Sequence, residues 1–269
     1  MGFLKKLLMI LSVTSAAIAL SACASTKMEY AESATIDIYP GPSMQGISRH
    51  LPENTIGSRL RGGVAIGASE KIGLDSVYNK GDWDSVEVDA RYKIKYLPVW
   101  GSIDKFVKGK LFTMNIGFGI YHGIYASTGF GINTKYFELG VQSFQRFTYE
   151  SFNYHAYEKT EDESLEKIED TNNNDKLVFQ YGAGAYASLF IKSVTLSYNG
   201  NVYRPNKSIV INDPVPEISF ATPYVFTNNF LISYWYSDTI EFQLGITNLL
   251  VDFNGGNWSL MAGVSLWTF

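Results

Sequence analysis

The strict alternation of apolar and polar side chains constrains this chain more than any other feature of its sequence. Its clearest instance spans residues 86–96, where Val86, Val88, Ala90, Tyr92, Ile94 and Tyr96 alternate with Glu87, Asp89, Arg91, Lys93 and Lys95. A period of two places the two kinds of side chain on opposite faces of a β-strand, and about 9–11 residues suffice for a tilted strand to cross a bilayer. The sequence therefore predicts an all-β chain whose strands are apolar on one face and polar on the other.

Similar segments recur from residue 58 to the end of the chain. They lie at 60–66, 112–120, 126–133, 137–142, 179–189, 194–202, 240–247 and 258–269, with an aromatic but irregular stretch at 217–236 that Pro223 interrupts. Over 58–269 we predict one antiparallel up-and-down transmembrane β-barrel of about ten strands. Because Pro223 could split or shorten one strand, eight or twelve strands are alternatives.

The connections between these segments alternate in length, as they do in outer-membrane barrels. If both chain ends lie on the periplasmic side, the outer loops would be near 70–84, 121–124, 150–176, 204–216 and 249–257. The inner turns would be 97–110, 134–135, 191–192 and 237–238. Most of the outer loops are long and most of the inner turns are tight, which supports the barrel independently of the alternation.

Composition agrees with a chain that meets lipid, because 46% of its residues are hydrophobic, 15% aromatic and only 18% charged. The rival interpretation is a soluble β-sandwich or lipocalin-like barrel with an apolar interior. That alternative would leave many strand glycines on the water face. A net charge of −4 and the lack of a basic cluster in the body argue against a nucleic-acid partner.

The N-terminus has the layout of an export signal, with Lys5 and Lys6 before an apolar stretch at 7–20. Leu20-Ser21-Ala22-Cys23 follows and resembles the lipobox of bacterial lipoproteins. The resemblance implies that lipoprotein-processing enzymes remove 1–22 and attach lipid, such as palmitate, at Cys23. Ala24, in place of Asp, favours the outer membrane of a Gram-negative cell. Residues 23–57, which contain Pro40, Gly41, Pro42 and Pro52, would then form a lipidated periplasmic tether or a plug.

The C-terminus ends in Leu266-Trp267-Thr268-Phe269. A terminal aromatic residue that closes an amphipathic strand resembles the signal read by the outer-membrane barrel assembly machinery, so Trp267 and Phe269 are the candidate assembly signal. Gly263 and Ser265 depart from the usual apolar alternation and leave the register of this strand open. The body as a whole resembles outer-membrane β-barrel proteins, which implies lipid and lipopolysaccharide as its surroundings.

Two features are expected to face the inside of the barrel. The first is a charge network that would block the pore: Arg59, Arg61, Glu87, Asp89, Arg91, Lys93, Lys95, Glu138 and Glu241. Charges in a narrow lumen are costly unless they are paired, although a wet lumen with solvated charges is the alternative. The second is a glycine patch, for which tight curvature or close approach of a plug or ligand are the two explanations: Gly117, Gly119, Gly129, Gly131, Gly140, Gly182 and Gly184.

No catalytic, cofactor or metal site is predicted. His50, His122 and His155 have no spacing typical of catalysis, and the acidic stretch near 170–181 lacks the glycine and glutamate of a calcium loop. Three functions remain: a small closed barrel with a structural or surface-interaction role, a narrow porin-like channel, and a membrane-embedded hydrolase of lipid or peptide. The first is favoured over the channel, and an enzyme is the least favoured.

Overall fold

The chain was analysed as a computed structural model, which describes residues 30–43, 45–47, 49–73, 77–79, 86–96, 98–159, 165–171, 176–205, 210–211, 218–220 and 223–269. The proposed signal and Cys23 lie outside these residues. Within the described ranges, no helix is long and apolar enough to cross a membrane.

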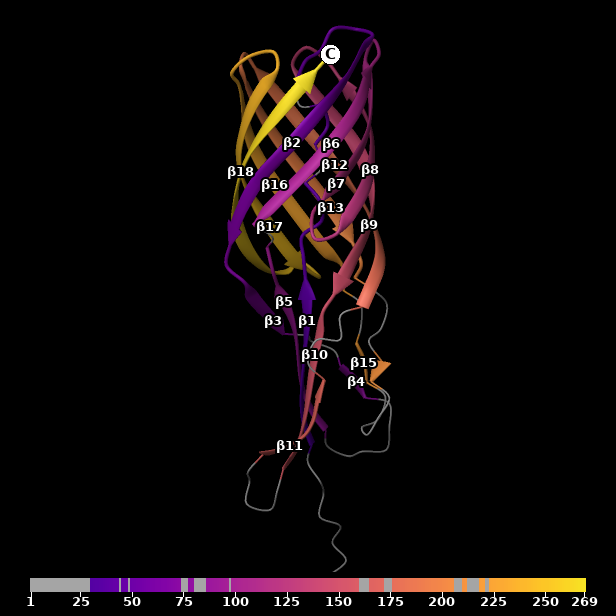
Figure 1. Ribbon diagram of the computed structural model, residues 1–269, viewed down its shortest axis with the longest axis vertical. Coiled ribbons are helices and arrows are strands. Elements are labelled where there is room, and N and C mark those ends of the chain that lie inside the picture. Colours follow the sequence, from indigo (N-terminus) through magenta and orange to yellow (C-terminus); the bar gives the residue numbers. More distant parts are fainter. Residues whose placement is uncertain are drawn as a thin grey trace, which may run out of the picture.

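Ten antiparallel strands form a closed barrel (Figure 1). In chain order they are β2 (Thr55–Gly67), β6 (Val99–Lys108), β7 (Phe112–Ile120), β8 (Ile124–Asn133), β9 (Phe137–Glu150), β12 (Lys176–Ile191), β13 (Val194–Tyr203), β16 (Val225–Trp235), β17 (Ile240–Val251) and β18 (Asn254–Thr268). The last strand pairs with the first, from Ser259 opposite Gly67 to Thr268 opposite Ser58, and this pairing closes the barrel. The predicted all-β fold, its up-and-down order and its strand number are confirmed.

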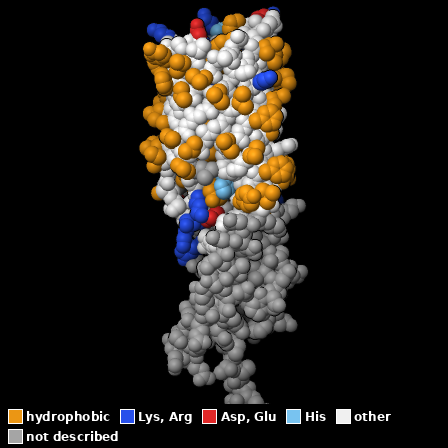
Figure 2. All heavy atoms as spheres, viewed as in Figure 1, with side chains coloured by type: hydrophobic (Ala, Val, Ile, Leu, Met, Phe, Trp, Pro, Cys, Tyr) orange, Lys and Arg blue, Asp and Glu red, His pale blue; other side chains and the backbone are white. Residues whose placement is uncertain are grey.

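Along the barrel strands the exposed positions are predominantly apolar and the buried positions predominantly polar. On β9, Leu139 is 51% exposed and Val141 is 62% exposed, whereas Glu138, which lies between the outward-facing Phe137 and Leu139, is fully buried. Figure 2 shows hydrophobic side chains spread over the barrel surface and most of the charged side chains at its two ends. This distribution is the inverse of a soluble β-protein and is that of a transmembrane barrel.

The two ends of the barrel differ in their connections. The short turns at 109–111, 134–136, 192–193 and 236–239 share one end with the C-terminus, which we call the turn end. The opposite end, the loop end, carries the connections at 68–98, 151–175 and 204–224 together with two short hairpins at 121–123 and 252–253. In the hairpin at 121–123, Gly123 has a φ of +111° and a Cβ there would collide with Phe147, so this tight turn requires glycine.

A second sheet stands beyond the loop end. Its strand order is β11 (Leu165–Thr171), β10 (Phe152–Lys159), β1 (Tyr30–Ile38), β5 (Val86–Ile94) and β3 (Glu70–Gly73). The N-terminal strand β1 lies in the middle, parallel to β5 and antiparallel to β10. A smaller sheet in the same region consists of β14 (Val210–Ile211), β15 (Ile218–Phe220) and β4 (Val77–Asn79).

One barrel strand differs from the prediction. The segment 86–96 was expected to cross the membrane, but β5 lies in the external sheet, where Tyr92 and Ile94 are buried. Its place in the barrel is taken by β6, which falls inside the expected inner turn 97–110. The β6 sequence does not show the usual pattern of a barrel strand, because the apolar Trp100 and Phe106 face inward and the charged Lys105 faces outward.

Candidate functional site: an occupied lumen

Residues 39–51 cross the lumen of the barrel from the loop end to the turn end, and we call them the lumen segment. The described part of this segment has no regular secondary structure. A main chain that crosses a barrel without strand partners must find other hydrogen-bond partners, because a buried, unpaired amide or carbonyl is costly. Pro40 and Pro42 reduce the number of main-chain donors that need a partner, because proline carries no amide hydrogen.

Side chains of the barrel wall hold the loop-end half of the lumen segment. The Arg146 guanidinium donates to the Pro40 carbonyl at 2.8 Å, and Asn201 Nδ2 donates to the Pro42 carbonyl at 2.9 Å. The Gly41 amide donates to Thr227 Oγ1 at 2.8 Å, and the Tyr203 hydroxyl donates to the Tyr39 carbonyl. These contacts come from β9, β13 and β16, so the segment is held from several sides of the lumen.

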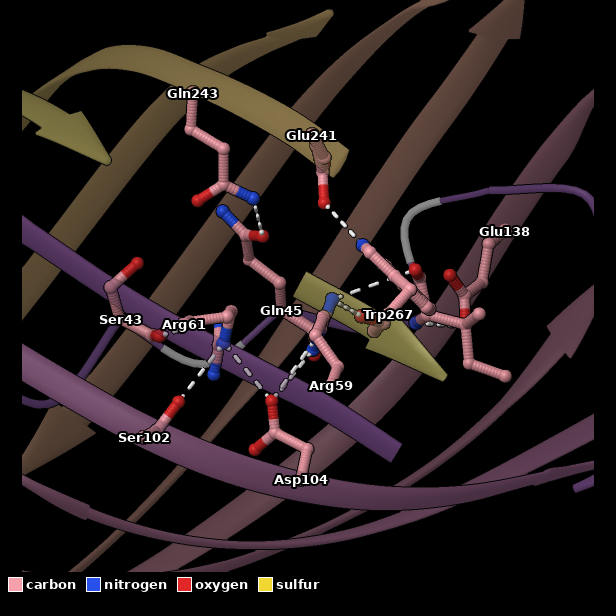
Figure 3. Close-up of polar contacts among 12 residues, drawn as sticks. Ser43, Gln45, Arg59, Arg61, Ser102, Asp104, Glu138, Glu241, Gln243 and Trp267 are labelled. Atoms are coloured by element: carbon pink, nitrogen blue, oxygen red, sulfur yellow. Dashed lines mark hydrogen bonds and ion pairs between the residues drawn. The ribbon is translucent and has the colours of Figure 1, made fainter. Parts of the chain in front are cut away.

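The turn-end half is held by charged residues. Arg59 donates to the Gly46 carbonyl at 2.9 Å and to the Gln45 carbonyl at 3.2 Å, and Arg61 donates to the Ser43 carbonyl at 3.2 Å. The Ile47 amide donates to Glu138 Oε1 at 3.0 Å. Gln243 from β17 donates to the Gln45 side chain at 3.0 Å, as Figure 3 shows.

The same charged residues pair with one another. Asp104 accepts from both arginines, with its Oδ2 atom 3.1 Å from Arg59 and 3.0 Å from Arg61. Glu241 accepts from the Trp267 indole at 3.0 Å, and Arg59 lies over the Trp267 ring (Figure 3). Asp104, Arg59 and Arg61 are all at least 98% buried. Burial makes each charge dependent on its partners, so the network fixes one arrangement of wall and segment.

The structure therefore brings four of the predicted network residues into the lumen: Arg59, Arg61, Glu138 and Glu241. Asp104, which bridges the two arginines, and Arg146 were not predicted. Asp104 lies in the stretch that was expected to be a turn. Arg146 occupies an inward position of β9, on the same face as Glu138 and Gln142. Strand periodicity could therefore have predicted that Arg146 faces the lumen.

The other five predicted charges lie outside the lumen, which corrects the prediction. Glu87, Asp89, Arg91 and Lys93 belong to β5 and Lys95 follows it, all in the external sheet. Lys95 forms an ion pair with Asp37 at the end of β1, at the loop-end mouth of the barrel. From Arg91 on the alternation holds, with Tyr92 and Ile94 buried and Arg91 exposed, but the strand belongs to another sheet.

The glycine patch lies on the inward face and makes room for aromatic side chains. A Cβ on Gly131 or Gly140 would meet the Tyr186 ring or its hydroxyl, and one on Gly182 would meet the Phe144 ring. The lumen segment uses the same space, because a Cβ on Gly46 would meet Tyr186 and Glu138. The remaining members meet inward neighbours in the same way, Gly117 against Asp104, Gly119 against Tyr125, Gly129 against Asn115 and Gly184 against Asn201. Close approach of wall side chains and of neighbouring strand backbone accounts for the patch.

An apolar cluster closes the turn end. Ile47 and Leu51 of the lumen segment pack with Phe106 and Trp267, each at most 3% exposed. Trp267, a predicted assembly residue, faces the interior, whereas Phe269 is 55% exposed. Arg49 lies over the Trp235 ring and pairs with Asp238 at 3.3 Å.

The histidines have structural contacts. His50 Nδ1 lies 3.1 Å from the Thr134 carbonyl at the turn end. His122 stacks on Tyr39 where the lumen segment enters the barrel, and its Nε2 lies 2.7 Å from the Tyr149 carbonyl. Burial lowers the pKa of His122 to about 4. The nearby positive charges of Arg146 and Lys95 lower this pKa further, whereas the hydrogen bond to the Tyr149 carbonyl raises it. The side chain of His155 is outside the described set.

The sequence matches no model of a known protein family and no curated protein. Among solved structures the chain is similar to the NanC porin, with 12% identity, a TM-score of 0.36 and coverage of 78% of this chain and 98% of that one. It is also similar to the translocator domain of the autotransporter NalP from Neisseria meningitidis, with 10% identity, a TM-score of 0.29 and coverage of 80% and 87%. The architecture described above rests on the strand pairing of this chain itself.

Proposed function

We propose that this protein is an outer-membrane barrel sealed by its own N-terminal segment, with a structural or surface-interaction role and no open pore. The observation that carries the proposal is the lumen segment, whose carbonyls are bound by buried Arg59, Arg61, Arg146 and Asn201 along the whole barrel. A channel needs a continuous water path, and this segment occupies it. The lipoprotein anchor at Cys23 and recognition by the assembly machinery belong to the proposal.

Conductance in planar bilayers tests the closed lumen. The full chain should give no steady ionic current, whereas a variant that lacks residues 30–51 should open a water-filled pore. A shift between folded and boiled samples on a gel would show that both proteins are folded barrels. Steady current from the full chain, equal to that of the deletion variant, would support the narrow channel instead.

Orientation follows from the usual arrangement of outer-membrane barrels, in which short turns face the periplasm and long loops face outward. With the turn end in the periplasm, the C-terminus is periplasmic, while β1 and the external sheet stand on the outer side. The strand β1 would then stand at the cell surface, whereas the sequence analysis expected residues 23–57 to form either a periplasmic tether or a plug.

Cysteine labelling of intact cells tests this orientation. Lys71→Cys at an exposed position of β3 in the external sheet should react with a membrane-impermeant maleimide, whereas Lys135→Cys in a short turn should react only after permeabilisation. The reverse pattern would place the external sheet in the periplasm.

A further inference from the structure

In the part of the chain that the structure describes, the outward face of the barrel carries one charged group. Among the described residues of the ten barrel strands, Lys105 on β6 is the only charged side chain with an outward position, between the exposed Ile103 and Val107. Within the described chain Lys105 has no carboxylate within ion-pair distance. An ammonium against hydrocarbon is unfavourable, so a long lysine side chain there extends toward the interface, where water or an anionic headgroup can solvate it.

Two hydroxyl side chains stand in the same row as Lys105. Strand pairing sets Thr268 of β18 opposite Ser58 of β2, and Ser58 opposite Lys105 of β6. Thr268 Oγ1 lies 3.4 Å from the Ser58 carbonyl. Lys105 is three residues from the end of β6, so the row lies close to the turn end of the barrel. A row of two hydroxyls and an ammonium matches the oxygens of a phosphate.

This row lines a groove of about 510 Å³ on the outer wall of the barrel. Its apolar walls include Ile56, Met114 and Ile116, and the Phe269 ring stands at its edge. A larger hollow of about 680 Å³ lies elsewhere on the outer wall, against β13, β16 and β17, and no charged residue lines it. The smaller groove therefore combines an anion-binding row with a surface for hydrocarbon, whereas the larger one has only the hydrocarbon surface.

We propose that this groove binds a glycerophospholipid, with the lipid phosphate at Lys105, Ser58 and Thr268 and an acyl chain along Met114 and Ile116. Charge complementarity selects a phosphate, and the apolar walls select a ligand that carries a hydrocarbon chain. In the proposed orientation the site faces the periplasmic leaflet. The proposal rests on the membrane location of the barrel, which the cysteine labelling of intact cells tests separately.

Native mass spectrometry of the full-length protein in neutral detergent tests the site, with phosphatidylglycerol as the probe. Wild type should retain one phospholipid, and K105Q should bind it about tenfold more weakly, the size of effect expected when a charge pair is lost. K110Q removes the same charge from the adjacent turn, outside the groove, and should bind as wild type does. I116W should also weaken binding because it fills the apolar part of the groove.

Equal phosphatidylglycerol binding by wild type and K105Q would overturn the proposal. Displacement of the lipid by millimolar inorganic phosphate would also overturn it, because the site would then be a simple anion site. Loss of lipid by K110Q as strongly as by K105Q would show general surface charge attraction and would contradict a specific groove. A normal gel shift in wild type and in all three variants ensures that none of these outcomes arises from misfolding.

Discussion

The two halves of the lumen hold the same segment by different means. At the turn end, Arg59 and Arg61 share Asp104 and also bind the segment's carbonyls, so ion pairs and segment depend on each other. At the loop end, Arg146 donates to the Gln180 amide oxygen and to the Pro40 carbonyl, and Asn201 accepts a hydrogen bond from the Gln142 amide. These partners are neutral. Buried ion pairs lose much more than neutral hydrogen bonds when one member is removed, so the turn end should be the firmer anchor.

The largest effect is expected from Asp104→Ala in the turn-end half. The change leaves Arg59 and Arg61 buried without their shared carboxylate, and breaking such a pair costs about 3–5 kcal/mol. The free energy of unfolding in urea, measured in lipid vesicles, gives the loss. Asp238→Ala is the matched control, because the Arg49–Asp238 pair is exposed at Asp238 and such pairs contribute about 0–1 kcal/mol. Similar losses in both variants would refute a buried network.

A smaller effect is expected from Arg146→Met in the loop-end half. The Pro40 carbonyl and the Gln180 side chain lose a donor in a buried place, which costs about 1–3 kcal/mol. Urea unfolding again measures the change, and Arg204→Met, which removes an exposed guanidinium over Tyr224, serves as the control. A loss larger than that of Asp104→Ala would reverse the proposed order of the two halves.

The smallest effect concerns the mouth of the loop end, where His122 covers Tyr39. The pKa of His122 is lowered to about 4 in the folded protein, below its usual value of 6.5. The unfolded chain therefore binds more protons between these values, so stability should rise from pH 4 to about pH 6.5 and then level off. In His122→Phe the ring stack can remain while titration is lost, and the slope of unfolding free energy against pH should fall. An unchanged slope would contradict the assignment of this pH dependence to the lowered pKa of His122.

The strands could be predicted from the sequence because alternation is local, and nine of the ten expected barrel segments correspond to barrel strands. The tenth was misassigned because 86–96 and 99–108 both alternate, and only long-range pairing decides which joins the barrel. β5 pairs with β1, which starts 56 residues earlier, as in Tyr30 opposite Val86. A pairing of that kind leaves no trace in either segment alone.

The candidate site was predicted only in part, for a similar reason. Inward charges such as Arg59 and Glu138 follow from strand periodicity, whereas the glycine patch left open whether the wall is tightly curved or closely approached by a plug or ligand. The lumen segment has no periodicity, and its partners are remote, with Gly41 and Thr227 separated by 186 positions. Pro40, Gly41 and Pro42 exclude regular structure but do not specify what the segment contacts.

A disulfide between segment and wall tests the occupied lumen most directly. A Cβ at Gly41 would lie 3.6 Å from the Asn201 Cβ, within the range that a disulfide spans, so cysteines at these two positions should be close enough to bond. We expect Gly41→Cys/Asn201→Cys to cross-link in outer membranes, with a mobility shift on denaturing gels that reductant reverses. Gly41→Cys/Leu196→Cys, with its second cysteine on the outward face of β13, should remain uncross-linked. No cross-link in the first pair, or equal cross-linking in both, would contradict a lumen filled by residues 39–51.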